Sequence, residues 1–128
     1  FTLDDDIFVK TVELEHKVKC FGYRIEDEAN SIAFMTDTLP TNKTIEFASH
    51  VSHFIHEATF TEEHAELAKE SKHTTFNQAI ELGKKANAKQ IYLTHFSPRI
   101  EDEEIEELEY KYNFISLHPC QKISVNGI

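Results

Sequence analysis

Short apolar segments of strand type alternate along this chain with longer segments of helical periodicity, and this alternation restricts the fold most strongly. Residues 6–15, 19–25 and 31–36 are each predicted to form a β-strand, and the polar run EDEAN forms a short hairpin-type connection between the last two. Strands and helices that alternate in this way predict an α/β layered domain.

The rest of the chain continues the alternation. Residues 74–87 give the clearest helix, because Phe76, Ala79, Ile80, Gly83 and Ala86 follow the three-four spacing of one buried face. The other predicted elements are helices over 44–50, 61–72 and 101–112, a buried strand over 90–94, a short strand over 52–55, and closing strands over 114–117 and 122–125.

Size and charge limit the classes of function. With 128 residues the chain has the length of one domain, enough for a single core, and no apolar run approaches the ~20 residues of a membrane helix. Thirteen basic and 23 acidic side chains give a net charge of −10, which lowers the expectation of a freestanding nucleic-acid binder. The first residue, Phe1, predicts a trimmed chain without a signal peptide. Cys20 and Cys120 fit reduced thiols in a cytoplasmic protein.

Polar side chains capable of binding a metal follow the predicted strands at their ends. His16, Asp37, the pair His56-Glu57 and His95 each stand at the end of a strand. Ligands of α/β sheets bind beyond strand ends, where loops converge. Histidine with carboxylate is the ligand set of zinc-type hydrolytic sites, in which the metal makes hydroxide near neutral pH. We therefore predict a hydrolytic metal site at this edge.

Each of these residues also has an ordinary interpretation. A single histidine at a strand end is more often a hydrogen-bonded polar residue than a ligand, and only the set favours the metal. The other histidines, His50, His53, His64 and His118, match no functional pattern, and the acidic run over 101–109 is most simply a solvated helix face.

The same strand ends lie within five short motifs that carry a family resemblance. Together and in this order, the motifs resemble those of ribonuclease Z, the tRNA 3′-processing endonuclease of the metallo-β-lactamase superfamily. One motif alone would be weak, but the combination is specific and spans most of the chain. The motifs are Leu14-Glu15-His16 with Phe21-Gly22-Tyr23-Arg24-Ile25, Met35-Thr36-Asp37-Thr38, His56-Glu57-Ala58-Thr59-Phe60, His73-Thr74-Thr75 and Leu93-Thr94-His95-Phe96-Ser97-Pro98-Arg99.

The resemblance implies a metal centre and its ligands. His16 would bind one metal ion, Asp37 would bridge two ions, and His95 would bind the second. The implied cofactor is a pair of divalent ions, zinc in the first instance and manganese as the alternative. A metal-activated water would then attack the phosphorus of a phosphodiester.

The resemblance also implies residues that act beside the metal. Glu57 would orient His73, and His73 would protonate the departing ribose 3′-oxygen or stabilise the phosphate. A purely structural hydrogen-bonded pair is an equal alternative for these two. Ser97 and Arg99 would approach phosphate oxygens, although a surface charge is the simpler interpretation of Arg99.

The leading motif of the family, HxHxDH, is absent from these residues. The chain, residues 1–128, is therefore expected to be the C-terminal half of a metallo-β-lactamase-type αββα sandwich, whose N-terminal half supplies the remaining ligands. Family members are often homodimers, and the open edge of a half-domain would favour association.

The predicted function is a ribonuclease Z-like phosphodiesterase that cleaves the 3′ trailer of precursor tRNA in the complete domain. The long arm by which such enzymes grip tRNA is replaced here by the seven residues EDEANSI. Two alternatives stay open: a hydrolase of the same fold that acts on small phosphodiesters or esters, and a non-catalytic half-domain for binding or assembly.

Overall fold

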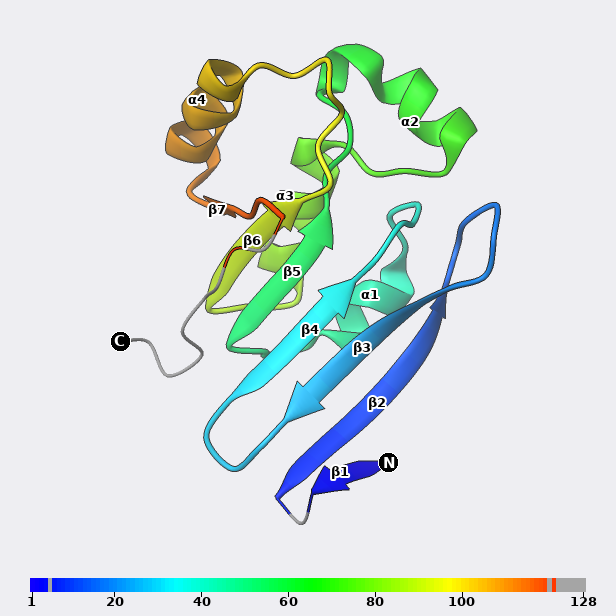
Figure 1. The fold of residues 1–128 in the computed structure, drawn as a ribbon, viewed down its shortest axis with the longest axis vertical. Coiled ribbons are helices and arrows are strands. Elements are labelled where there is room, and N and C mark those ends of the chain that lie inside the picture. The colour runs from blue at the N-terminus through cyan, green and yellow to red at the C-terminus, as the bar shows by residue number, and fades with distance from the viewer. Residues whose placement is uncertain (5, 120, 122–128) are drawn as a thin grey trace.

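The computed structural model describes residues 1–4, 6–119 and 121, and its framework is one seven-stranded sheet (Figure 1). The strands lie in the sheet in the same order as in the sequence. They are β1 (Thr2–Asp4), β2 (Ile7–Leu14), β3 (Cys20–Glu26), β4 (Ser31–Met35), β5 (His53–Glu57), β6 (Gln90–Thr94) and β7 (Ile115–Ser116).

The sheet changes character at β4. Strands β1 to β4 pair antiparallel through short connections, whereas β4 to β7 pair parallel and need longer crossovers. The turn between β3 and β4 closes on Asp27, whose carboxylate accepts the backbone N–H groups of Ala29 and Asn30 at 2.8 and 2.7 Å. The hairpin predicted over EDEAN is therefore present.

The helices belong to the connections between the parallel strands. They are α1 (Asn42–Phe47), the 3-10 turn η1 (Glu62–His64), α2 (Ala65–Ser71), α3 (Phe76–Lys85) and α4 (Asp102–Tyr112). The parallel strands are added in one direction, so crossovers of the usual right hand place their helices on the same face. Figure 1 shows α1 and α3 behind the sheet, with α2 beyond the strand ends.

The core lies between the sheet and α3. Met35, Phe54 and Leu93 point from three neighbouring strands toward the helix, and each is fully buried. The helix contributes Phe76, Ala79, Ile80, Leu82, Gly83 and, at its C-cap, Ala86, of which the sequence periodicity predicts all except Leu82.

The sequence predictions of the elements are largely confirmed, with differences at several ends. The first helix covers Asn42–Phe47 rather than 44–50, because its end is fixed by the Arg24 guanidinium, which donates to the carbonyls of Phe47 and Ser49. Strand β5 continues to Glu57 because it keeps pairing with β6 as far as Thr94.

Two further differences concern short segments. The helix predicted over 61–72 is a 3-10 turn followed by α2, and the short β1, which pairs with β2, was not predicted. The strand predicted over 122–125 lies outside the described residues, as does Cys120. Cys20 is a free thiol, as expected.

The sheet face opposite the helices carries apolar side chains without a covering helix. Tyr23 and Phe34 are directly opposed on β3 and β4, and they are 39% and 37% exposed. Phe21, on the same face of β3, is 37% exposed. Aromatic side chains on one sheet face are typical of a surface that packs on another layer.

No described helix combines the length and the apolar character needed to cross a lipid bilayer.

Gly83 tests the close packing of α3 on the sheet. A Cβ built there would lie 2.6 Å from Ile91 Cδ1 and 3.0 Å from Phe54 Cδ2. Gly83→Ala should therefore destabilise the fold by about 1–3 kcal/mol, although alanine normally stabilises a helix interior by about 1 kcal/mol. Urea unfolding measures the change.

Asn77→Ala is the matched control, because Asn77 is exposed on the same helix. It should change stability by no more than about 0.5 kcal/mol. A Gly83→Ala protein as stable as the wild type would contradict the close packing.

Candidate metal centre

The candidate residues meet because four strands end at the same edge of the sheet. Strand β2 is antiparallel to β3, and β3 is antiparallel to β4, so β2 points in the same direction as the parallel strands. His16 follows β2, Asp37 follows β4, Glu57 ends β5, and His95 follows β6. The strand-end pattern of the sequence therefore gathers these side chains in one place.

Asp37 lies between the two histidines that the sequence pairs with it. Its Oδ2 is 3.8 Å from Nε2 of His16, and its Oδ1 is 3.5 Å from Nδ1 of His95. The Asp37 side chain is 36% exposed, so its oxygens remain accessible. A carboxylate with one histidine near each oxygen has the composition of a metal ligand set.

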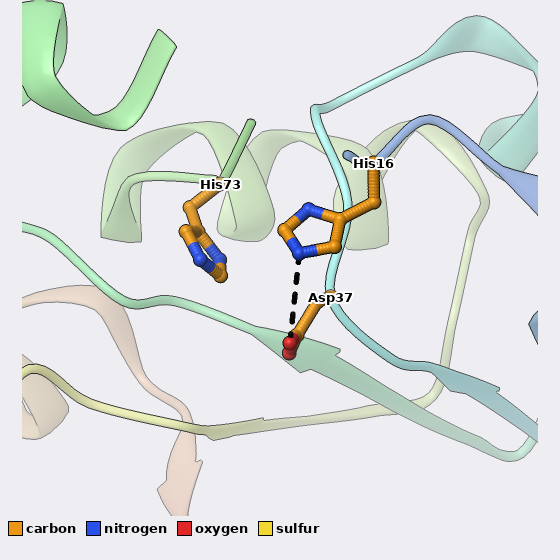
Figure 2. Close-up of side chains that lie close together, drawn as sticks. All are labelled: His16, Asp37 and His73. Carbon is orange, nitrogen blue, oxygen red and sulfur yellow. Dashed lines mark ion pairs between the residues drawn. The ribbon is translucent and has the colours of Figure 1, made fainter. Parts of the chain in front are cut away.

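His73 joins the same cluster from the loop between α2 and α3. Figure 2 shows the side chains of His16, Asp37 and His73 turned toward one another. One potential ligand atom from each of the three lies within 4.8 Å of the others, and the same holds for Glu57, His73 and His95. His73 is thus common to both groups, and its ring centroid is 4.9 Å from that of His16 and 5.4 Å from that of His95.

The backbone fixes the ring of His16. Its Nδ1 lies 2.8 Å from the carbonyl oxygen of Lys72, so Nδ1 carries the proton and donates it. Lys72 is the C-cap of α2 and adopts the left-handed conformation with φ 60°. The lone pair of His16 is therefore on Nε2, the atom that faces Asp37. Metal-binding histidines are commonly oriented in this way.

Glu57 is a buried carboxylate that accepts hydrogen bonds on both oxygens; its residue exposure is 1%. Oε1 accepts from the backbone N–H of Thr38 at 3.0 Å and from Nδ1 of His73 at 2.7 Å. Oε2 accepts from the hydroxyl of Thr59 at 2.7 Å, and from the backbone N–H groups of Thr59 and Thr74 at 3.1 and 3.3 Å. Five donors satisfy a charge that burial would otherwise disfavour.

The loop that presents His73 is held at both sides. Thr75 caps α3 through a capping box with Gln78. Thr74 has a different role, because its hydroxyl donates to the carbonyl of Thr38 at 2.7 Å. These contacts tie the His73 loop to the loop that follows Asp37.

His95 occupies a strained backbone position. Its φ is 62°, a region that non-glycine residues rarely adopt, and its side chain is 51% exposed. Such conformations cost of order 1–3 kcal/mol and concentrate at functional sites. In this conformation the imidazole Nδ1 lies 3.5 Å from Oδ1 of Asp37.

A cavity of about 680 Å³ opens beside this cluster. Asp37, Glu57 and His95 form its polar side. The rest of the wall includes the apolar side chains of Phe34, Met35, Phe96, Ile100, Ile105 and Leu117. A small molecule or one end of a larger substrate could therefore contact the polar cluster and an apolar wall together.

The structure separates Ser97 from Arg99. Ser97 is buried and lines the cavity, and its Oγ accepts the backbone N–H of Arg99 at 3.3 Å. The Arg99 residue itself is exposed and is absent from the cavity wall that the structure describes. His118, to which the sequence gave no role, lines the cavity and contacts the ring of Phe96.

His56 points away from the site, into the core. It is completely buried beside Phe54; its Nδ1 donates to the carbonyl of Glu57 at 2.7 Å. Its Nε2 has no hydrogen-bond partner among the described residues. Burial lowers the pKa of His56, and the neighbouring Glu57 offsets this only in part.

The lowered pKa of His56 predicts that folding depends on pH. An unfolded histidine binds a proton near pH ~6.5, whereas folded His56 resists it, so stability is lost as the pH falls below about 6.5. His56→Asn keeps a hydrogen-bond donor but does not titrate. Between about pH 6.5 and 5, its free energy of unfolding should therefore fall less steeply than that of the wild type, by up to about 1.4 kcal/mol per pH unit. Urea unfolding between about pH 7 and 5 measures both slopes.

His64→Asn is the control, since His64 is exposed. The free energy of unfolding of His64→Asn should change with pH as steeply as that of the wild type. An unchanged slope in His56→Asn would contradict the prediction.

Sequence comparison agrees with the fold and the site. The profile of the family described as "Beta-lactamase superfamily domain" matches residues 1–96, which is most of the chain. The chain belongs to this β-lactamase superfamily. The matched segment contains His16, Asp37, Glu57, His73 and His95.

Curated relatives of this chain include ribonucleases Z. It is 42% identical over 73 residues to ribonuclease Z of Brevibacillus brevis, covering 57% of this chain and 23% of that protein. It is 35% identical over 91 residues to the zinc phosphodiesterase ELAC protein 2 homolog of Caenorhabditis elegans, covering 71% and 11%. The chain thus spans only about a quarter or less of these relatives.

Solved structures give the same result for the superfamily fold. The short form of human tRNase Z superposes with a TM-score of 0.76 and 26% identity, covering 95% of this chain and 43% of that chain. The metallo-β-lactamase fold protein YhfI of Bacillus subtilis, at 19% identity and TM-score 0.75, shows the shared fold. The family resemblance and the α/β fold class predicted from the motifs are confirmed.

Proposed function

We propose that this chain is the C-terminal half of a ribonuclease Z-like, metal-dependent phosphodiesterase. The observation that carries the proposal is the cluster at one sheet edge, where Asp37 lies 3.8 Å from His16 and 3.5 Å from His95, next to the Glu57–His73 pair. The similarity to ribonucleases Z and to a zinc phosphodiesterase supports the same reaction class.

The donor set fits divalent metal ions. Two imidazoles and a carboxylate are ligands that zinc accepts, and the accessible oxygens of Asp37 allow it to bridge two ions. We assign His16 to one ion, His95 to the other and Asp37 to both, with zinc as the first choice and manganese as the alternative. When bound, the ions would supply hydroxide near neutral pH and stabilise charge on the phosphoryl oxygens.

Glu57 and His73 would handle the proton of the leaving group. The carboxylate of Glu57 holds Nδ1 of His73 at 2.7 Å and would stabilise the imidazolium form of the ring. His73 could then deliver a proton from Nε2 to the departing ribose 3′-oxygen, which is a poor leaving group without it. Ser97, on the cavity wall, could contact a phosphate oxygen.

Two classes of substrate are candidates for this site. Precursor tRNA is the proposed substrate, because a ribonuclease Z and a tRNase Z are among the relatives described above. The tight turn at Asp27, however, leaves no arm between β3 and β4 to grip a large RNA. This observation favours a small phosphodiester or ester as the second candidate.

The role of His73 can be tested in the complete protein. His73→Ala should lower turnover of a phosphodiester by at least about 100-fold, because general acid catalysis contributes 10²–10⁴-fold. Its metal content should stay near that of the wild type, measured by atomic emission after dialysis. Because His73 lies within 4.8 Å of His16 and Asp37, a parallel loss of metal would instead identify His73 as a ligand.

The half-domain assignment predicts that residues 1–128 alone are inactive. Three ligands shared between two ions are too few for a tight site, and Tyr23 and Phe34 are exposed on the uncovered sheet face. The chain should show no turnover of a chromogenic phosphodiester or a precursor tRNA with added zinc or manganese. Addition of the HxHxDH-bearing half should restore activity.

Activity of the isolated chain at the level of a complete enzyme would overturn the half-domain assignment. Binding of metal without hydrolysis of any phosphodiester or ester, even after the halves are combined, would favour the non-catalytic alternative. The mass distribution in solution would test the predicted homodimer at the same time.

A further inference from the structure

The hydroxyl of Thr59 lies between three side chains of the candidate site. Its Oγ1 is 2.7 Å from Oε2 of Glu57, 2.9 Å from Nδ1 of His95 and 3.2 Å from Nδ1 of His73. The residue is only 7% exposed. Thr59 belongs to the same sequence motif as Glu57, but the proposed reaction gives its hydroxyl no role.

A count of protons decides the direction of these hydrogen bonds. A hydroxyl has one proton to donate, and an ionised carboxylate can only accept, so Thr59 donates to Glu57. The oxygen of Thr59 must then accept protons from the histidines. His73 has one proton on Nδ1, and its contact with Oε1 of Glu57 at 2.7 Å is shorter than its contact with Thr59.

The remaining donor to Thr59 is therefore Nδ1 of His95, at 2.9 Å. Asp37 Oδ1 also faces this nitrogen, but at 3.5 Å it is a weaker acceptor. We propose that Thr59 is a positioning residue that holds the proton of His95 on Nδ1 and so reserves Nε2 as the lone pair for a metal ion. The metal part of this statement rests on the proposed function.

The two histidine ligands would thus be oriented by different means. The backbone carbonyl of Lys72 fixes His16, and no side-chain substitution removes that carbonyl. His95 is 51% exposed on a strained turn and depends on a side-chain hydroxyl that substitution can delete. Thr59 also connects His95 to Glu57, and through Glu57 to His73.

The test measures the tautomer of His95 directly. Long-range nitrogen–proton NMR spectra of the labelled 128-residue chain, without metal at about pH 8.5, identify which ring nitrogen is protonated in a neutral imidazole. The wild type should show the proton on Nδ1. Thr59→Val, which keeps the shape but deletes the hydroxyl, should shift His95 toward the Nε2–H tautomer, and Thr59→Ser should restore the wild-type spectrum.

Thr74→Val is the matched control. It deletes another buried hydroxyl of the same site, but that hydroxyl donates to the carbonyl of Thr38 at 2.7 Å, and among the described residues no hydrogen bond joins it to His95. The His95 tautomer should be unchanged in this variant. A proton on Nε2 of His95 in the wild type, or the same tautomer in Thr59→Val as in the wild type, would overturn the proposal.

Two precautions keep the result interpretable. If Thr59→Val does not fold, Thr59→Ala replaces it, and the wild-type spectrum alone can still overturn the proposal. In the complete protein, Thr59→Val should weaken zinc binding by about 10–100-fold. A complete protein that binds no metal at all would refute the proposed function, whereas the tautomer measurement would still decide the role of Thr59.

Discussion

The buried carboxylate of Glu57 is the interaction on which the geometry of the site depends. Its five donors come from three separate segments: the loop after β4, the turn after β5 and the loop that precedes α3. A buried charge is tolerated only when such donors are in place, so the three segments must converge together. The carboxylate therefore both orients His73 and holds together the loop of Asp37 and the turn of Thr59.

The sheet explains why this convergence occurs at one edge. Parallel crossovers after β4 bring the ends of β4, β5 and β6 side by side, and the antiparallel β2 and β3 return β2 to the same edge. The same crossovers leave the other face without a helix, with Tyr23 and Phe34 exposed. One topology thus creates both the candidate site and the apolar surface that a second half would cover.

Hydrophobic periodicity in the sequence predicted the elements whose structure is set by the burial of their own side chains. The apolar face of α3 and the strand Gln90–Thr94 follow from spacing alone, because side-chain burial imposes that spacing. The short β1 and the early end of α1 were not predictable in this way. They depend on partners distant in the sequence, such as the Arg24 guanidinium on the carbonyls of Phe47 and Ser49.

The sequence by itself determined the family and the α/β class, and it supplied the candidate residues His16, Asp37 and His95, because motif chemistry and strand-end positions are local properties. Only the tertiary structure decided that Arg99 stands apart from the cavity, that His56 belongs to the core, and that the Thr59 hydroxyl joins Glu57 to His95. Thr59 and His95 are 36 residues apart, and their hydrogen bond exists only because adjacent strands β5 and β6 end together. A linear motif specifies which donors and acceptors are available, whereas the fold decides which of them meet.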